Sequence, residues 1–206
     1  MNIYYKYVPR MFVVKKTWKD FLNDFLTKHF KQFINGQIGL YVSPFYDNSV
    51  NALLLSFDCD KKRVANSLDR LYDTIRVLYK MLNGKCDIVT TNNGYHIISH
   101  HPVMIKGASD IVKVNHFLRD NIGSKVPAVD WNGSVKVTPF GRLGRAESGI
   151  YMNPIDIDHL QFRNKIKHMP PIKLNSDPHW WTDYITKHLR PDLSKRLSLK
   201  RLIANV

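Results

Sequence analysis

Residues 61–85, KKRVANSLDRLYDTIRVLYKMLNGK, place the tightest constraint on how this 206-residue chain can fold. Apolar side chains recur there at alternating steps of four and three residues, which is the period of an α-helix that is buried along one side. Asn83 and Gly84 then favour the end of the helix. A helix with one apolar stripe needs a sheet or another helix to cover that stripe. The residues of the stripe are Val64, Leu68, Leu71, Ile75, Leu78 and Leu82.

Strand-like segments stand on both sides of this predicted helix. LLLSFDCD (53–60) precedes it, and CDIVTTNNGYHIIS (86–99) follows as two β-rich runs joined by a tight-turn sequence. SDIVKVNHFLRDNIG (109–123) predicts a second helix, and KVPAVDWNGSVKVTP (125–139) returns to strand-like alternation. The resulting order β-α-β-β-α-β predicts an α+β fold with a ferredoxin-like, or RRM-like, core in which helices pack on one face of a sheet.

Additional elements flank this core. TWKDFLNDFLTKHFKQFING (17–36) reads as an amphipathic helix, and IGLYVSPFY (38–46) as an extended segment. Beyond about residue 165 the chain contains a proline-broken linker, an aromatic-rich helical segment and a terminal basic helix. We therefore expect a catalytic-type domain over residues 1–165 and a basic helical tail over residues 166–206.

The charge of the chain favours a polyanionic partner. Lys and Arg number 31 against 17 Asp and Glu, so the formal net charge is +14. Nucleic acid is the usual partner of so basic a chain, and no segment has the apolar length needed to span a bilayer. The amino terminus lacks the pattern of a signal peptide, and Cys59 and Cys86 belong to no zinc-binding Cys/His array. We expect a cytoplasmic protein without disulfides, zinc or a membrane partner.

Acidic residues at the predicted strand ends are the candidates for chemistry. Asp58 and Asp60 are two positions apart, so their side chains share one face of a strand, where they repel unless a cation or a proton separates them. His96 lies in the hairpin that returns beside them, and Asp130 ends the segment after the second helix. Three carboxylates suit Mg²⁺ or Mn²⁺, and a pair of such ions can activate a 3′-hydroxyl and neutralise a triphosphate. This is the chemistry of nucleotidyl transfer.

Three motifs carry a resemblance to a known family. LLLSFDCD, NNGYHII and AVD with RLGR downstream resemble the three-motif pattern of the archaeo-eukaryotic primase superfamily, which includes primase-polymerases of archaeal plasmids and viruses. The resemblance covers roughly residues 40–150. It implies two divalent ions held by Asp58, Asp60 and Asp130. It also implies contacts to the phosphates of the incoming nucleotide from Gly94, His96, Arg142 and Arg145.

The resemblance implies a function and its partners. The chain is expected to be a DNA primase or primase-polymerase of an archaeal virus or plasmid, which uses NTPs or dNTPs on a single-stranded DNA template. It departs from the family pattern before Gly94, where Thr91, Asn92 and Asn93 replace the usual Ser-Gly start. The zinc-binding insertion of cellular primases and a helicase module are absent from the sequence. A helicase or a second primase subunit is therefore an expected partner.

Structural roles compete with the catalytic ones for the same residues. Asp60 can cap a helix that starts at Lys61, with Asp58 paired to Lys61 or Lys62. His96 can be a hydrogen-bonded structural histidine. Several other residues also remain open at this point: Asp156 and Asp158 as the third metal ligand, Arg142 and Arg145 as surface bases, His100 and His101 as exposed or supporting residues after the hairpin strand, and Trp180 and Trp181 as base-stacking or core residues.

Two other functions fit parts of the sequence. A rolling-circle initiator nickase shares the sheet topology, but it needs a histidine pair around one apolar residue, and this chain has no such triplet. A non-catalytic module for single-stranded nucleic acid would display aromatic residues such as Phe57 and Tyr95 on the central strands for stacking.

Overall fold

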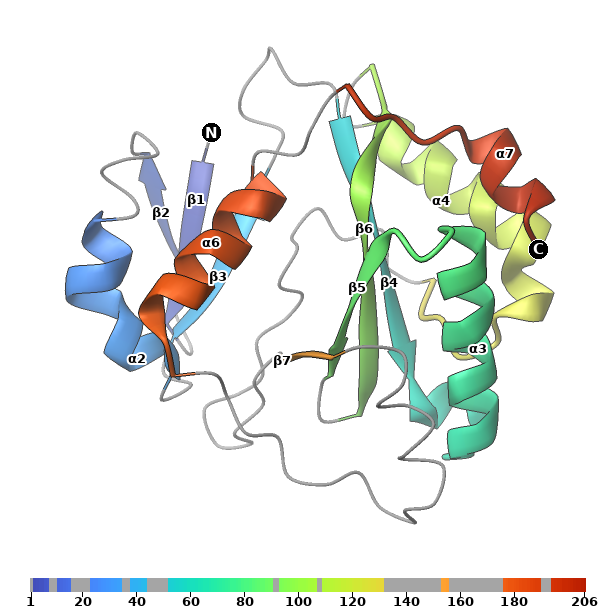
Figure 1. The fold of residues 1–206 in the computed structure, drawn as a ribbon, viewed down its shortest axis with the longest axis horizontal. Helices are drawn as coiled ribbons and strands as arrows, with labels where there is room; N and C mark the ends of the chain where they lie inside the picture. The colour runs from blue at the N-terminus through green and yellow to red at the C-terminus, as the bar shows by residue number, and fades with distance from the viewer. Residues whose placement is uncertain are drawn as a thin grey trace.

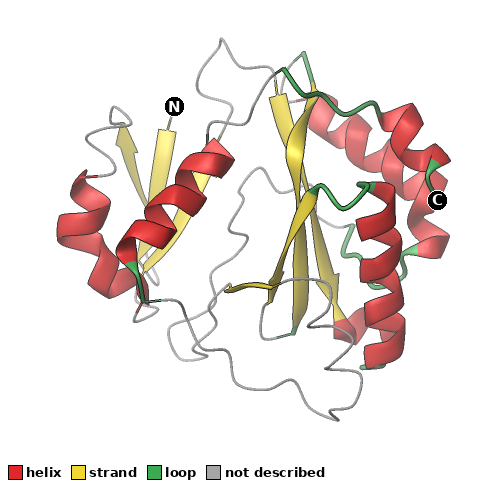
Figure 2. Cartoon of the chain, viewed as in Figure 1, coloured by secondary structure: helices red, strands yellow, loops and turns green. Residues whose placement is uncertain are grey.

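The chain is a mixture of helices and antiparallel sheets, which confirms the predicted α+β class (Figures 1 and 2). Among the described residues, the strands form one sheet of three and one of four. The computed structural model describes residues 2–7, 11–15, 23–34, 38–43, 52–90, 93–106, 109–131, 153–155, 176–189 and 194–206.

The four-stranded sheet carries the sequence motifs. Its strands are β4 (Ala52–Asp60), β5 (Cys86–Thr90), β6 (Gly94–Met104) and β7 (Asn153–Ile155), in the order β4-β6-β5-β7. Every neighbouring pair is antiparallel. Val129 adds an isolated antiparallel bridge to Cys59. Because β6 pairs with one side of β4, the Val129 segment lies along the other side, and β4 has a neighbour on each edge.

Helices α3 (Leu68–Met81) and α4 (Ser109–Ile122) lie on one side of this sheet (Figure 1). Alternate side chains of β4 point into the core between the sheet and the helices, as a strand with one buried face requires. Leu71, Ile75 and Leu78 of α3 are fully buried in the same core, so the predicted apolar stripe is confirmed. The β4 residues in the core are Leu53, Leu55, Phe57 and Cys59.

The single helix predicted from Lys61 is wrong at its start. A 3₁₀ turn, η3 (Lys61–Val64), comes first, and α3 begins only after Ser67, whose hydroxyl oxygen accepts a hydrogen bond from the Arg70 N–H. Between them Ala65 and Asn66 have positive φ angles of 54° and 60°, which end a right-handed helix. Val64 is nevertheless buried in the core, so the apolar period continues across the break.

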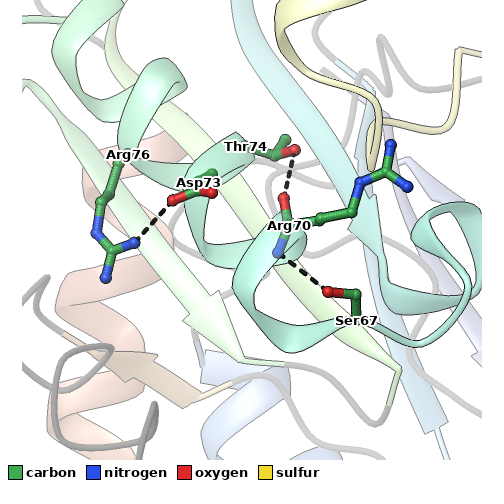
Figure 3. A network of polar contacts seen from close by, with 5 residues as sticks. All are labelled: Ser67, Arg70, Asp73, Thr74 and Arg76. Atoms are coloured by element: carbon green, nitrogen blue, oxygen red, sulfur yellow. Dashed lines mark hydrogen bonds and ion pairs between the residues drawn. The ribbon is translucent and has the colours of Figure 1, made fainter.

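Polar contacts on α3 fix the helix and the segment beside β4 (Figure 3). The Thr74 hydroxyl donates to the Arg70 carbonyl at 3.0 Å, and Arg76 pairs with Asp73 at 3.1 Å. The Thr74 oxygen also accepts from the Ala128 N–H at 3.3 Å. This second contact ties the residues just before Asp130 to α3.

The remaining elements flank this unit. Strands β1 (Asn2–Tyr7), β2 (Met11–Lys15) and β3 (Ile38–Ser43) form the other sheet, in the order β2-β1-β3. The extended segment predicted from residue 38 is confirmed where it is described. The predicted helix at 17–36 is described over 23–34, as a π-helical turn η1 (Phe25–His29) followed by α2 (Phe30–Ile34). A short 3₁₀ turn, η4 (Gly123–Lys125), follows α4.

The carboxyl-terminal residues pack on the same core. Helices α6 (Pro178–Leu189) and α7 (Leu199–Ala204) confirm that this region is helical where it is described. Leu202 is buried in the core, and the Asn205 side-chain amide donates to the Met81 carbonyl at 3.0 Å. The domain division at residue 165 remains a prediction, but α7 belongs to the sheet's hydrophobic core. Within the described ranges, no helix has the length and apolarity to cross a membrane.

Gly94 allows a close approach of strands β4 and β6. It lies opposite Asp60, and a Cβ atom at this position would sit 1.8 Å from the Cys59 carbonyl oxygen. Such a contact is with backbone, which a rotamer change cannot relieve. The family resemblance made Gly94 a nucleotide-binding residue, and the structure gives it an independent packing role.

We predict that Gly94→Ala lowers the free energy of unfolding by about 3 kcal/mol, because strands β4 and β6 must separate to admit the methyl group. Gly123→Ala is the matched control: its Cβ would meet the Arg119 side chain at an ordinary 3.6 Å, so its effect should stay within about 1 kcal/mol. Urea unfolding measures both. Equal stabilities for the two variants would contradict the proposed strand contact.

Candidate active site

The acids of β4 lie on the sheet face opposite α3 and α4. Side chains alternate along a strand, and Phe57 and Cys59 occupy the helix-facing core, so Asp58 and Asp60 project from the other face. The register places Asp58 directly opposite His96 of β6 and Asp60 opposite Gly94. The sequence predicted this arrangement of the hairpin beside the acids, and the structure confirms it.

Asp58 and His96 form an ion pair if the imidazole is protonated. Nε2 of His96 lies 3.1 Å from Oδ1 of Asp58. The His96 side chain is only 6% exposed, and its Nδ1 atom is buried without a hydrogen-bond partner in the described part of the chain. A buried polar atom in this state costs free energy unless a ligand or water satisfies it. His96 therefore has one nitrogen held by Asp58 and the other available for such a partner.

Asp130 lies beside Asp58 on the opposite edge of β4. Its N–H donates to the Asp58 carbonyl at 2.8 Å, and the Asp60 N–H donates to the Ala128 carbonyl at 2.9 Å. These bonds flank the Cys59–Val129 bridge, so Asp130 is directly opposite Asp58 and on the same face. We call His96, Asp58 and Asp130, which come from three neighbouring segments, the acid row.

Asp60 has a structural role as the cap of η3. Its Oδ1 atom accepts a hydrogen bond from the Lys62 N–H at 2.9 Å, so it caps η3. This is the capping role that competed with metal binding in the sequence. No group of three or more His, Cys, Asp or Glu side chains in the described ranges is arranged to hold a metal ion.

The acid row fits a divalent cation in part. Asp58 and Asp130 would supply the hard carboxylate oxygens that Mg²⁺ and Mn²⁺ prefer. The two residues lie opposite each other on neighbouring segments of the chain. Asp60 is on the same face but is turned to its cap. Two of the three predicted ligands are thus brought together, and the third has one carboxylate oxygen held by the Lys62 N–H.

Arg63 is the residue that sequence reasoning missed. It is carried by η3, and its Nη2 atom lies 2.5 Å from Oδ1 of Asp130, which joins residues 67 positions apart. Both side chains are partly exposed, at 42% and 35%. The cluster Lys61-Lys62-Arg63 directly after the acids was the available signal, but a run of bases does not reveal which one folds back.

Other predicted residues have varied outcomes. Arg142, Arg145, Asp156 and Asp158 lie outside the described residues, so their roles stay predictions. His100 and His101 lie within β6 and do not follow it, because that strand extends to Met104. His100 pairs with Asp87 at 2.9 Å. Trp181 is fully buried and packs edge-on against Trp180, which favours the core interpretation for Trp181.

The proposed stacking platform is not available on the described strands. Phe57 and Tyr95 are the aromatic residues that a non-catalytic binding module would display. They are 1% and 0% exposed and belong to the helix-side core. Bases cannot stack on them without unfolding the core, so this alternative loses the feature that suggested it.

Comparison with known protein families, with curated proteins and with solved structures finds no match. The site is therefore interpreted from its own geometry.

Both cysteines are buried thiols with suppressed ionisation. Burial, and then the negative charge of Asp58, raises the pKa of Cys59 well above its ordinary value. Burial, and then the charge of Asp87, raises the pKa of Cys86 from 9.0 to about 12. Thiolates are the nucleophilic form of cysteine, so neither thiol is suited to covalent chemistry near neutral pH.

We predict that Cys86 makes the free energy of unfolding fall as the pH rises above 9. Above pH 9 the unfolded thiol ionises while the folded one stays neutral until about pH 12, so folding is disfavoured by up to about 1.4 kcal/mol per pH unit. The stability advantage of the wild type over Cys86→Ala, measured in urea, should therefore shrink from pH 9 to 12. The advantage over Ile88→Val, a buried control on the same strand, should not vary, and parallel changes in both would contradict this assignment.

Proposed function

We propose that the protein is a metal-dependent nucleotidyltransferase, a DNA primase or primase-polymerase that founds or extends strands on single-stranded DNA. The acid row is the observation that carries the proposal. It brings together His96, Asp58 and Asp130, which belong to three separate motifs, on one face of one sheet. These are the residues that the resemblance to the primase superfamily selected from sequence order.

The strand order supports the same proposal. The Val129 segment, β4, β6 and β5 lie in that order, with α3 and α4 connecting strands on the other face. This is the arrangement expected of a ferredoxin-like or RRM-like core read as β-α-β-β-α-β. The helices cover one face of the sheet, and the acid row lies on the other face.

Each residue has a distinct proposed task. Asp58 and Asp130 would hold Mg²⁺ or Mn²⁺, with Asp60 as a further ligand if its cap opens. A bound ion would neutralise the triphosphate and favour ionisation of the attacking 3′-hydroxyl. Asp58 also orients His96, whose Nδ1 atom, when protonated, can donate to a phosphate oxygen. Gly94 allows the strand approach that places His96 beside Asp58.

The template would be bound through its phosphates. Besides the net charge of +14, exposed bases follow the end of β4 in the chain: Lys62 on η3 and Arg70 in the first turn of α3. Figure 3 shows the Arg70 guanidinium extending away from the polar contacts of the helix. Arg142 and Arg145 remain proposed nucleotide contacts, and a helicase or second primase subunit remains a proposed partner in replication.

We predict that wild-type protein incorporates labelled NTPs or dNTPs on single-stranded DNA in Mg²⁺ or Mn²⁺. Asp58→Asn, which keeps the shape of the side chain and removes its charge, should reduce incorporation at least about a hundredfold. Asp60→Ser separates two roles, because serine can still cap η3 but offers no carboxylate. Its loss of activity without loss of thermal stability would support metal binding by Asp60.

Asp73→Asn is the matched control for both variants, because Asp73 is an ion-paired acid on the exposed side of α3. It should retain full incorporation. No incorporation by a folded wild type, with or without a primer, would contradict the proposed function. Nicking of supercoiled DNA with covalent attachment of the protein would indicate the rolling-circle nickase in its place.

We also predict that DNA binding depends on the exposed bases that follow β4, Lys62 and Arg70. For single strands, the slope of log affinity against log salt changes by about 0.7 for each phosphate that the protein no longer neutralises. The double variant Lys62→Gln/Arg70→Gln should therefore lower the magnitude of the slope by about 1.4, as measured by fluorescence anisotropy with an oligonucleotide. Lys28→Gln/Arg76→Gln removes two bases that are paired with Asp24 and Asp73, and it should change the slope little. Equal slopes for the two double variants would contradict this template surface.

A further inference from the structure

We propose that Arg63 is the resident counter-ion of the acid row. In the protein without a divalent cation it holds Asp130. When a cation takes that carboxylate, Arg63 is released to bind a phosphate of the nucleotide. The inference rests on the proposed function and adds to it a residue that was not among the predicted nucleotide contacts. Its basis is the 2.5 Å contact between Nη2 of Arg63 and Oδ1 of Asp130.

The backbone places Arg63 at the acid row. Asp60 caps η3, and the Lys61 N–H donates to the Asn93 carbonyl at 2.9 Å, so the turn is fastened to β4 and to the start of β6. Ala65 and Asn66 then adopt left-handed conformations, which non-glycine residues keep only where the surrounding structure fixes them. Arg63 is therefore held by a defined turn and not by a long flexible loop.

Charge balance explains what Arg63 does in this position. Asp58 and Asp130 are directly opposite each other, and like charges in that arrangement repel. Each carboxylate has its own basic partner: His96 contacts Asp58, and Arg63 contacts Asp130. A divalent cation bound between the acids would compete with the Arg63 guanidinium for the Asp130 carboxylate, because both cations neutralise the same negative charge.

The released guanidinium would suit a phosphate. Arginine keeps its charge at all working pH values, and its planar group presents five N–H donors that match phosphate oxygens. The Arg63 side chain is 42% exposed, so part of it stays in contact with solvent while Nη2 contacts Asp130. Binding measurements distinguish this counter-ion role from that of an exposed Arg63–Asp130 ion pair with no further function.

The test compares Arg63→Gln with Arg76→Gln. Arg76 is 40% exposed and also pairs with an aspartate, Asp73, but it is carried by α3, on the side of the sheet opposite the acid row. Binding of Mn²⁺ alone is measured by the electron paramagnetic resonance signal of the free ion. Binding of a non-hydrolysable nucleoside triphosphate is then measured in saturating Mn²⁺. Arg63→Lys keeps the charge without the planar donors. Thermal melts of all variants show that any effect on binding is not caused by unfolding.

The counter-ion role predicts effects of opposite sign. Arg63→Gln should bind Mn²⁺ about two- to fivefold more tightly and the triphosphate about two- to fivefold more weakly than the wild type, with Arg76→Gln changing neither by as much. If the wild type binds Mn²⁺ but Arg63→Gln and Arg76→Gln change the Mn²⁺ and triphosphate affinities equally, the role of Arg63 is overturned and the proposed function stands. Weaker Mn²⁺ binding by Arg63→Gln than by the wild type would have the same meaning. No Mn²⁺ binding by any folded variant would overturn both.

Discussion

The antiparallel pairing of β4 with β6 is the constraint on which the site depends. Because side chains alternate with a period of two, this register decides at once which residues enter the core and which form the acid row. Phe57 and Cys59 meet Ile97 and Tyr95 on the helix side, while Asp58 meets His96 on the other. A slip of one residue would bury Asp58 under α3 and would expose Cys59. The apolar core therefore also fixes the register of the polar site.

Repulsion between neighbouring carboxylates limits how the acids of this site can be arranged. Carboxylates on one face of a sheet repel, and the molecule reduces this repulsion by using each acid differently. Asp58 contacts His96, Asp130 contacts Arg63, and Asp60 accepts a backbone N–H. A cation bound at these acids would have to compete with these contacts. Affinity for a cation would be the difference between the two sets of contacts, and not the sum of three carboxylate bonds.

The sequence predicted the parts of this arrangement that follow from local periodicity. The α3 stripe, the strand ending in Asp58 and Asp60, and the hairpin carrying His96 are each set by patterns within a few residues of one another. The start of α3 was missed because the sequence offers two capping residues, Asp60 and Ser67, seven positions apart. The spacing of apolar residues does not distinguish one continuous helix from a turn followed by a helix. The burial of Leu202 was missed because it depends on contacts with α3 and α4, far away in the sequence.

Long-range pairing also explains why the site was predicted only in part. The opposition of Asp58 and Asp130 requires a backbone bridge between β4 and a segment about 70 residues later, which the strand order implied but the residues alone could not fix. Arg63 illustrates the same limit more sharply. Its neighbours Lys61 and Lys62 have the same charge, and only the geometry of the turn selects Arg63 to reach Asp130. Since Asp60 caps that turn, the position of Arg63 depends on an acid that is itself a candidate ligand. A cation that drew the Asp60 Oδ1 atom away from the Lys62 N–H would loosen the turn that holds Arg63 against Asp130, and it would thereby couple the two acids and the arginine through one short segment of backbone.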